Sequence, residues 1–410
     1  MNLLFLAWKN LWRNRRRTII TLTALSLSLM LLQGSHNLSH GVYSSMIDSG
    51  VRAGSGHLVV YHEGYLESRD EKLTFSPLGL ERKIAGIPVV RAVLPRVYLP
   101  GLAQSSRESR GILLTGVDPA VEKSINPFLK KLSASEWLTS PDSHEAILGS
   151  RLLKELKLKP GNKFVVTMQH QSGELVSEMF RVRGVVKTGI KNIDKTLLMV
   201  GLKRAAALAG VNGQVHELAI MLEDQNAGPQ IWPQLNELLE AHEDIAAYSW
   251  EQAMPNLYNA IRLDYASSNF IFVILLLIVA IGVVNTLLMS VMERFREFGV
   301  ILAVGARTVR LRFLIILEAL LMGVTSMILG SCLGSLLTWY LVAVGIDMRN
   351  FISETLEFGG VVFDPVLRAA WDFPWMIKIS FYLLLLSFCA ALYPSIKAGR
   401  ISPVAAMRHY

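Results

Sequence analysis

Charged residues and cysteine are both scarce in this chain. Asp, Glu, Lys and Arg make up 18% of its 410 residues, hydrophobic residues make up 51%, and the mean hydropathy is +0.37. So few charges cannot cover an ordinary soluble protein, and part of the chain must therefore contact lipid. The two cysteines exclude a disulfide-rich class, and 30 glycines with 15 prolines are too few for a collagen-like or low-complexity chain.

The motifs of several enzyme classes are also missing. The chain has no G-x-x-x-x-G-K-[ST] loop, which excludes a P-loop nucleotide site, and no G-x-S-x-G elbow. We therefore expect no enzyme activity, cofactor or metal site on this chain. None of its four His-Glu pairs has the second histidine, four residues on, that a zinc peptidase helix requires. We interpret all four pairs as solvated surface: His62-Glu63, His144-Glu145, His216-Glu217 and His242-Glu243.

Four long runs without Asp, Glu, Lys or Arg predict four transmembrane helices. About 20 helical residues cross the roughly 30 Å of hydrocarbon in a bilayer. The first run turns polar after Leu32, so we place its lipid-buried part at Thr18 to about Leu38, and Lys378 extends the last run by snorkelling. The runs are Thr18–Ile47, Tyr265–Met292, Ala319–Gly345 and Ile379–Ile396.

The first run has an alternative interpretation as a cleaved signal peptide, because four arginines precede it at positions 13, 15, 16 and 17. The long basic lead of 17 residues and the lack of a small-x-small cleavage site favour a retained anchor. We therefore keep this segment as the first transmembrane helix.

Lysine and arginine near the helix ends predict the orientation of the chain. They gather at the N-terminus, between the second and third helices, and in the tail, so we expect these parts in the cytoplasm. The connection between the third and fourth helices carries five acidic residues against Arg349 and Arg368, and we expect it outside. Much of the net charge of +8 is thus interpreted as a topological signal, so nucleic acid is not expected as a partner.

Residues 41 to about 264 form a large external insert that is long enough to bury its own core. Strand and helix patterns alternate along it, which predicts a mixed α/β domain, and Pro88, Pro95 and Pro100 are interpreted as breaks around the second strand. Both cysteines, Cys332 and Cys389, lie in predicted membrane helices instead. The predicted strands are 56–61, 89–99, 111–117, 163–169, 175–186, 196–200 and 217–222, and the predicted helices are 152–158, 202–208 and 231–241.

Between the second and third transmembrane helices, residues 292–306 combine mixed charges with an apolar face that ends at glycine. This pattern predicts a short amphipathic helix parallel to the membrane. Such a helix serves either as an interfacial anchor or as a docking element for a cytoplasmic partner, and composition favours neither.

Small residues recur every fourth position in the third helix, at Ser326, Gly330, Gly334 and Thr338. They permit another helix to approach closely, either within the chain or in a dimer. Glu318 lies one to two turns inside the same helix, where an unpaired carboxylate is costly. We interpret it as a structural acid that either snorkels or pairs with Arg312 or an arginine of the preceding connection, with a relay role in coupling as the alternative.

The order of these parts resembles the permease subunits of the MacB, LolC/LolE and FtsX group, the type VII ABC transporters. The similarity covers nearly the whole chain and is strongest at residues 293–306, followed by Leu317-Glu318-Ala319. The chain lacks the fused ATPase domain of the MacB pattern, and its single insert is closer to the lipoprotein-releasing permeases. Further similar segments are 7–17, 147–162, 184–189, 248–251 and 393–408.

The resemblance implies a dimeric permease, pairing with an identical or homologous copy, that carries two separate ABC ATPase subunits holding ATP and Mg²⁺. It implies an external domain with a membrane-near α/β part and a distal β-rich part. It also implies a rigid helix that starts near Pro255 and continues through the second transmembrane helix, to carry motion. The expected location is the bacterial inner membrane, with both termini cytoplasmic and the large domain periplasmic.

The function implied is the extraction of lipidated or other hydrophobic cargo at the periplasmic face, foremost lipoprotein release to a periplasmic carrier. The alternatives are efflux with a periplasmic adaptor, and a signal relay that controls a periplasmic hydrolase. The resulting division of the chain is 1–40 (amphipathic helix and first span), 41–264 (periplasmic domain), 265–292 (second span), 293–310 (coupling helix and loop), 311–346 (third span), 347–374 (periplasmic loop) and 375–410 (fourth span and tail).

Four groups of site residues follow. Glu318 is the candidate relay acid, and Gly330 and Gly334 are the helix-packing residues. An apolar cargo cleft between the two permease copies is predicted at Leu29, Leu32, Ile271 and Ile274. The predicted ATPase-coupling residues are Glu293, Arg294, Phe295, Arg296, Glu297, Phe298, Gly299, Val300, Leu302, Ala303 and Gly305.

Overall fold

The computed structural model describes residues 3–77, 79–188, 191–224, 227–242, 244–348, 357–358, 361–362 and 366–400. The chain divides into two units. The membrane unit comprises Met1–Tyr43, Leu263–Phe351 and Val366–Tyr410, and the external unit comprises Ser44–Arg262 and Ile352–Pro365. Parts of the predicted 347–374 loop, the end of the 184–189 segment and the tail beyond Arg400 lie outside the described residues.

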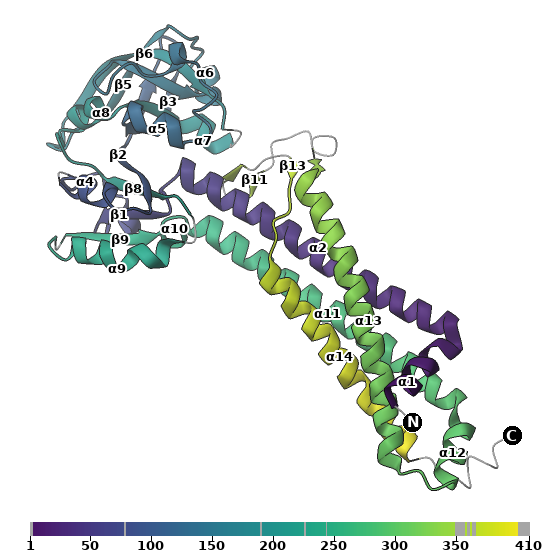
Figure 1. The fold of residues 1–410 in the computed structure, drawn as a ribbon. Coiled ribbons are helices and arrows are strands. Elements are labelled where there is room, and N and C mark those ends of the chain that lie inside the picture. Colours follow the sequence, from purple (N-terminus) through teal and green to yellow (C-terminus); the bar gives the residue numbers. More distant parts are fainter. Residues whose placement is uncertain are drawn as a thin grey trace. The chain divides into compact units, whose positions relative to one another are not determined.

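Within the described residues, four helices are long and apolar enough to cross a membrane, which confirms the predicted number. The mixed α/β domain lies between the first and second of them, as predicted. The second spanning helix begins at Pro255, also as predicted, because proline at the first helical position costs no intrahelical hydrogen bond. The helices are α1 (Leu3–Leu11), the short turn η1 (Trp12–Asn14), α2 (Arg15–Ala53), α11 (Pro255–Glu293), α13 (Thr308–Ala343) and α14 (Phe373–Gly399) (Figure 1).

The small-residue stripe of α13 is a packing surface for α2. At Gly330, a Cβ atom would lie only 2.9 Å from Cβ of Leu29, and Gly334 is covered by the side chain of Gln33. One turn further, Nδ2 of Asn37 donates a hydrogen bond to Oγ1 of Thr338 at 3.0 Å. The stripe is therefore buried within the chain, which decides between the two interpretations of these residues in favour of internal packing.

The polar residues that follow Leu32 in α2 face other helices. Gln33 is fully buried, and its Nε2 donates to Oγ of Ser380 on α14 at 3.1 Å. His36 lies stacked on Trp375, with 3.7 Å between the ring centroids, and its Nε2 lies 3.0 Å from Oδ2 of Asp372, the residue that caps α14. The change from apolar to polar sequence thus marks helix contacts rather than the end of the helix.

The described residues between 44 and 262 of the external unit form one nine-stranded mixed sheet with the order β3-β7-β4-β6-β5-β2-β8-β1-β9. An extra pairing of β3 with β2 closes six of these strands into a barrel. The strands are β1 (Leu58–His62), β2 (Val90–Gln104), β3 (Ser109–Val117), β4 (Glu145–Gly149), β5 (Lys163–Gln169), β6 (Leu175–Val186), β7 (Leu197–Gly201), β8 (Glu217–Leu222) and β9 (Ile245–Ser249).

Strand β2 belongs to both parts of this sheet. Its first half pairs with β8 of the small sheet β9-β1-β8-β2, and its second half pairs with β3 and β5 of the barrel. Short helices cover the two parts (Figure 1): α3 (Tyr65–Ser68), α4 (Leu80–Ala85), α5 (Pro119–Ile125), η2 (Ala134–Glu136), α6 (Ser150–Glu155), α7 (Lys191–Thr196), α8 (Leu202–Ala209), α9 (Gly228–Leu239) and α10 (Trp250–Ala253). Four two-residue strands form two antiparallel pairs, β10 with β13 and β11 with β12: β10 (Ile346–Asp347), β11 (Glu357–Phe358), β12 (Val361–Val362) and β13 (Val366–Leu367).

All seven predicted strands are present in the nine-stranded sheet of the described residues, and two strands of that sheet were not predicted. The predicted strand 89–99 already includes Pro95, but its expected end before Pro100 is wrong, because β2 runs through both prolines, paired with Leu218 and Leu113 respectively. A proline removes one N–H donor from a strand but leaves its carbonyl and its extended φ intact. The missed strands, β4 and β9, are only five residues long and lack a clear alternating pattern.

A buried ionic cluster lies where β2 passes from the small sheet to the barrel. Arg96 donates to Oε1 of Glu122 at 2.8 Å and to Oε1 of Glu217 at 3.1 Å, and both partners are buried. The hydroxyls of Tyr61 and Tyr98 donate to Glu217 at 2.7 and 3.1 Å. The prediction that every His-Glu pair is solvated is therefore wrong for His216-Glu217, where both side chains are buried.

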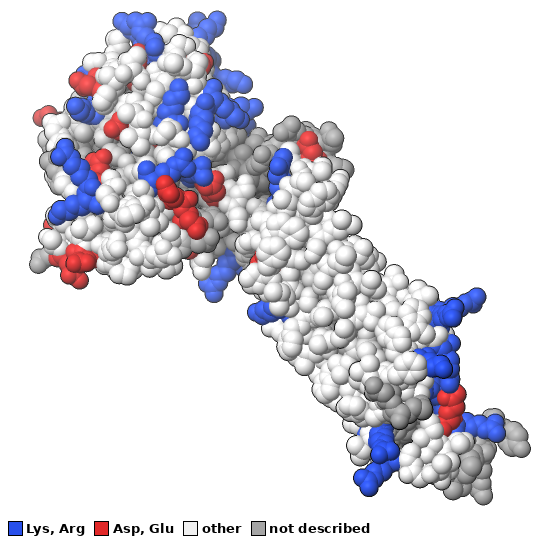
Figure 2. Space-filling view, viewed as in Figure 1, with Lys and Arg blue, Asp and Glu red and all other residues white. Residues whose placement is uncertain are grey.

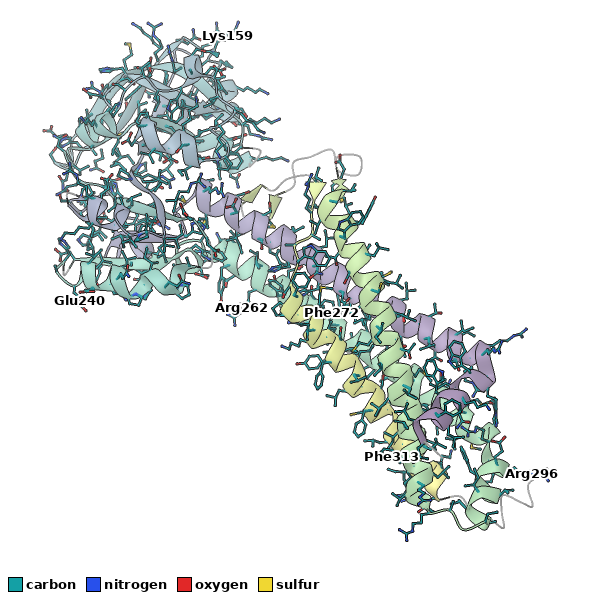
Figure 3. All side chains as sticks on the ribbon, in the orientation of Figure 1. Lys159, Glu240, Arg262, Phe272, Arg296 and Phe313 are labelled. Atoms are coloured by element: carbon teal, nitrogen blue, oxygen red, sulfur yellow. The ribbon has the colours of Figure 1, made fainter. Side chains whose placement is uncertain are left out.

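The two parts of the external unit carry opposite charge. Residues 96–209, which include most of the barrel, hold 18 Lys and Arg against 10 Asp and Glu. Residues 44–95 and 210–262 hold only 7 Lys and Arg against 14 Asp and Glu. Figure 2 shows basic side chains around the barrel, and Figure 3 places Lys159 on it and Glu240 at the end of α9. These opposite charges nearly cancel within residues 44–262, so most of the net charge of +8 lies in the rest of the chain, where the topological interpretation placed it.

The packing of α2 on α13 predicts the effect of adding one methyl group. Gly330→Ala should lower the melting temperature of the purified protein, because its Cβ meets Leu29 and the carbonyl oxygen of Ser26 at 3.0 Å. The matched control is Gly282→Ala on α11, where nothing lies within 4 Å of the added atom. That control should gain up to about 1 kcal/mol from helix propensity. Equal melting temperatures for the two variants would contradict the close α2–α13 contact.

The external unit should lose stability in mild acid. Burial lowers the pKa of His57 and of His216 below the ordinary value, and each Nδ1 accepts a backbone N–H, from Leu222 and Tyr98 respectively. The unfolded chain takes up protons on these histidines below about pH 6.5, whereas the folded chain does not, so stability falls as pH falls. We expect a lower melting temperature at pH 5.5 than at pH 7.5. His216→Gln should reduce this difference, whereas the control His62→Gln should leave it unchanged. If His216→Gln also leaves the difference unchanged, the assignment of the acid sensitivity to His216 is contradicted.

Candidate functional site

A short helix, α12 (Phe295–Ala303), connects α11 to α13, as the amphipathic pattern predicted. The chain bends at both of its ends. Arg294 leaves helical geometry between α11 and α12, and Gly305 has a φ of +93° before α13 begins at Thr308. A φ of this sign strains any residue with a Cβ atom, so the glycine permits the turn.

Glu318 of α13 forms a buried ion pair beneath α12. Nη1 of Arg294 donates to its Oε1 at 2.8 Å, and the carboxylate is only 6% exposed. Nδ2 of Asn10 on α1 donates to the same oxygen at 2.7 Å. The prediction of a paired acid is confirmed, and the partner is Arg294 of the connection, whereas Arg312 lies beside Gly399 of α14. A single carboxylate thus joins α1, α13 and the start of α12.

Two exposed ion pairs connect the N-terminal segment to the same region. Both Nη atoms of Arg13 contact the Glu297 carboxylate, at 2.7 and 2.9 Å, and Arg17 pairs with Glu293. The hydrogen bonds from Arg13 hold the pKa of Glu297 below its ordinary value. A single exposed pair stabilises a fold little, but these pairs share one helix connection with the buried pair and restrain it together.

The two faces of α12 have different environments. Phe298 is 1% exposed and lies under the Arg294 guanidinium, 4.7 Å from ring centroid to Cζ. It packs in a cluster with Val291, Leu311, Ile315 and Ala398. On the other side Val300, Ile301 and Val304 are 47%, 41% and 85% exposed. An apolar face of this kind needs lipid or protein to cover it.

The predicted coupling residues divide between these two faces. The inward set holds the helix in place: Arg294, Phe298 and Gly299 are buried, and Phe295 and Leu302 are half-buried. The exposed set is Glu293, Arg296, Glu297, Val300, Ala303 and Gly305. Docking of an ATPase on the exposed set stays a prediction, as does a relay role for Glu318.

The four predicted cleft residues do not share a surface. Leu29 and Leu32 are 0% and 2% exposed and lie in the core between the helices, so the prediction that they line an open cleft is wrong in this conformation. Ile271 and Ile274 of α11 are 54% and 41% exposed and remain candidates. Small residues on α13 draw α2 inward, and the sequence of α2 alone does not show this.

The role of helix α1 was missed by the sequence analysis. Its Ala7 and Leu11 are buried, whereas Leu4, Phe5 and Trp8 are more than 40% exposed. Asn10 lies between these faces and reaches Glu318. The spacing of Ala7, Asn10 and Leu11 is a weak sign of a second, inward face, since residues three and four apart lie on one side of a helix.

No group of three or more His, Cys, Asp or Glu side chains in the described ranges is placed to hold a metal ion. In the external unit, one cavity of about 220 Å³ lies beside Arg96 and Glu122, and another of about 520 Å³ lies between α9 and α10.

Comparison with known proteins confirms the resemblance to type VII ABC transporter permeases. Residues 269–403, which include α12, α13 and α14, match the FtsX-like permease C-terminal family. The chain is 25% identical over 329 residues to the lipoprotein-releasing system transmembrane protein LolC of Neisseria meningitidis, covering 78% of each chain. It is 21% identical to LolE of Haemophilus influenzae, covering 79% of each.

Other similarities extend to export proteins and to solved external domains. The macrolide export ATP-binding/permease protein MacB of Bdellovibrio bacteriovorus is 27% identical over 244 residues, covering 56% of this chain and 34% of MacB. The periplasmic region of MacB from Actinobacillus actinomycetemcomitans is 16% identical, with a TM-score of 0.36, covering 48% of this chain and 91% of that structure.

The buried pair at Glu318 should contribute more to stability than the exposed pairs. Glu318→Gln leaves the Arg294 guanidinium without its counter-ion in an apolar setting, and we expect a loss of about 3 kcal/mol in the free energy of unfolding. Glu293→Gln, whose carboxylate is 42% exposed, serves as the matched control and should cost under about 1 kcal/mol. Denaturant unfolding of the purified protein measures both, and equal losses would contradict the buried pair.

Proposed function

We propose that this FtsX-like permease is the membrane subunit of an ATP-driven complex that extracts lipidated proteins from the outer face of the bacterial inner membrane. The observation that carries the proposal is the match to LolC across 78% of both chains, which includes residues of both units. In this proposal ATP is hydrolysed on separate subunits, and this chain converts their motion into release of the cargo.

The exposed face of α12 supports docking of an ATPase subunit. Val300, Ile301 and Val304 offer apolar area, and Arg296 adds a charge at its edge. An apolar centre with a polar rim is the usual anatomy of a protein interface. In a symmetric dimer of permeases, each copy binds one ATPase through α12, and both termini then lie in the cytoplasm.

Helix continuity supports transmission of the motion. Helix α11 is unbroken from Pro255 to Glu293, and 39 residues at 1.5 Å per residue give a rod of about 58 Å. Residues of α11 and α2 occur in both units of the chain. We propose that a displacement of α12 tilts these two helices and thereby moves the external unit.

The exposed face of α11 supports a contact with cargo or with the second permease copy. Ile271 and Ile274 belong to a row of apolar side chains that this chain leaves uncovered, with Phe270 and Ile278 at 68% and 60% exposure. An acyl chain that leaves the bilayer needs an apolar surface along its path. We propose that this face of α11, rather than α2, provides that surface.

A patch on the barrel supports docking of a periplasmic carrier or adaptor. Outward side chains of β2 and β6, the two strands that flank β5, are exposed: Leu102 of β2 by 46%, and Leu175 and Met179 of β6 by 76% and 52%. On the same face Lys163 of β5 lies directly opposite Arg181 of β6. Two like charges placed opposite each other destabilise a sheet, and an acidic partner relieves that repulsion. We propose that the partner presents an apolar centre bordered by acidic residues.

Efflux through a periplasmic adaptor is the second candidate function, supported by the similarity to MacB at 27% identity. The same barrel patch fits an adaptor. The two functions differ in the substrate, which is a lipid-anchored protein in one case and a soluble small molecule in the other.

Reconstitution into liposomes with the cognate ATPase tests the proposal. A triacylated fluorescent reporter should leave the liposomes in the presence of ATP and a soluble carrier. Val304→Asp should lower ATPase stimulation about tenfold by placing a charge in the proposed docking face. Met179→Glu should lower only the transfer to the carrier.

Three results would contradict this account. ATP-dependent export of a macrolide without release of the reporter would support the second candidate function instead. If Val304→Asp stimulates the ATPase as strongly as the wild-type chain does, the assignment of α12 to docking is contradicted. If Met179→Glu transfers the reporter to the carrier as well as the wild-type chain does, the barrel patch does not dock the carrier.

A further inference from the structure

An aromatic cavity of about 520 Å³ lies in the acidic part of the external unit, between the N-terminus of α9 and the start of α10 and α11. Trp232, Trp250 and Tyr258 line it, together with Pro229. The rings of Trp250 and Tyr258 meet edge to face, with 6.1 Å between their centroids. The volume is in the range of small-ligand and peptide pockets, and aromatic rings that remain half-exposed on a domain surface mark contact sites.

His57 supplies one hydrogen-bond donor to this cavity. The backbone N–H of Leu222 donates to its Nδ1 at 3.1 Å, so in the neutral ring the hydrogen is on Nε2. Burial lowers the pKa of His57, which keeps the ring neutral above mild acid. His57 is 7% exposed and lines the cavity, and its Nε2–H is the polar group of the ring that is left for a ligand.

The charge around the cavity is negative. Glu251 lines it, and Asp48 and Asp224 act on His57 from neighbouring elements. Arg52 also acts on His57, but its Nε is paired with Oδ1 of Asp48 at 2.7 Å. With 14 acidic against 7 basic residues in this part of the unit, a cationic ligand is attracted and an anionic one is repelled.

We propose that this cavity binds an extended peptide that carries both proline and basic residues. A polyproline II segment has no internal hydrogen bonds, so its carbonyls are free to accept from His57. Its rigid prolines pack on aromatic rings at little entropic cost, which is how aromatic grooves recognise such segments. Glu251 then faces a lysine or arginine of the peptide. The proposal is independent of the proposed function, because it involves neither α12 nor the barrel patch.

Titration of the full-length protein in nanodiscs tests this proposal. The probes are three labelled ten-residue peptides: one of alternating proline and arginine, one of alternating proline and glutamate, and one of alternating glycine and arginine. Fluorescence anisotropy should show binding of the first peptide, binding at least about tenfold weaker of the third, and none of the second.

Two variants distinguish binding in the cavity from non-specific attraction of a basic peptide to the negative charge around it. Glu251→Gln should weaken binding of the proline-arginine peptide about threefold, whereas Glu237→Gln, which removes an exposed charge of α9, should leave it unchanged. Tyr258→Ala should weaken binding about fivefold or more by removing a ring that is 36% exposed. Circular dichroism confirms that each variant is folded.

The proposal fails if the proline-arginine and glycine-arginine peptides bind equally, or if Glu251→Gln and Glu237→Gln behave alike. Palmitate provides the remaining comparison. If palmitate quenches the tryptophan fluorescence, Tyr258→Ala abolishes this quenching and no peptide binds, the cavity is assigned to an acyl chain and the proposal is overturned.

Discussion

The carboxylate of Glu318 holds together the end of the membrane unit on which the candidate function depends. An ionised acid in an apolar bundle must find a counter-ion, and Arg294 and Asn10 both donate to it. These two partners come from the α11–α12 bend and from α1, so one charge determines where three helices meet. The amphipathic helix α12 is therefore a restrained element, and its exposed face keeps a defined position relative to α13.

The same requirement, that buried polar groups be paired, organises both units. In the membrane unit, Gln33 and His36 connect α2 to α14, whereas Asn37 connects α2 to α13. In the external unit, Arg96 is buried where β2 changes partners and binds two carboxylates. Apolar contacts alone permit helices to slide and strands to shift register, whereas paired polar groups have one geometry that satisfies them. Both units thus have unique arrangements at the points where their elements join.

The external unit separates positive and negative charge into its two parts, and this division gives its two candidate surfaces different partners. The barrel patch offers apolar side chains beside Lys163 and Arg181, whereas the cavity near Trp250 offers aromatic rings beside Glu251. Short sequence windows do not show the division, because the acidic part is made from two segments on either side of the barrel sequence. The pairing of β1 with β8 and β9, and of β2 with β8, brings those segments into one sheet.

The sequence by itself determined the four spans, the α/β class of the insert, the start of α11 at Pro255 and the amphipathic helix α12. Each of these depends on local chemistry: hydrocarbon excludes charge along a whole span, and helix or strand periodicity follows from the backbone. The tertiary structure decided that Leu29 and Leu32 are buried, that Gly330 and Gly334 pack inside the chain, and that Glu318 pairs with Arg294. It also decided that β2 continues through Pro100. These are contacts between distant residues, and a side chain's partner depends on which elements meet, so no local pattern contains it.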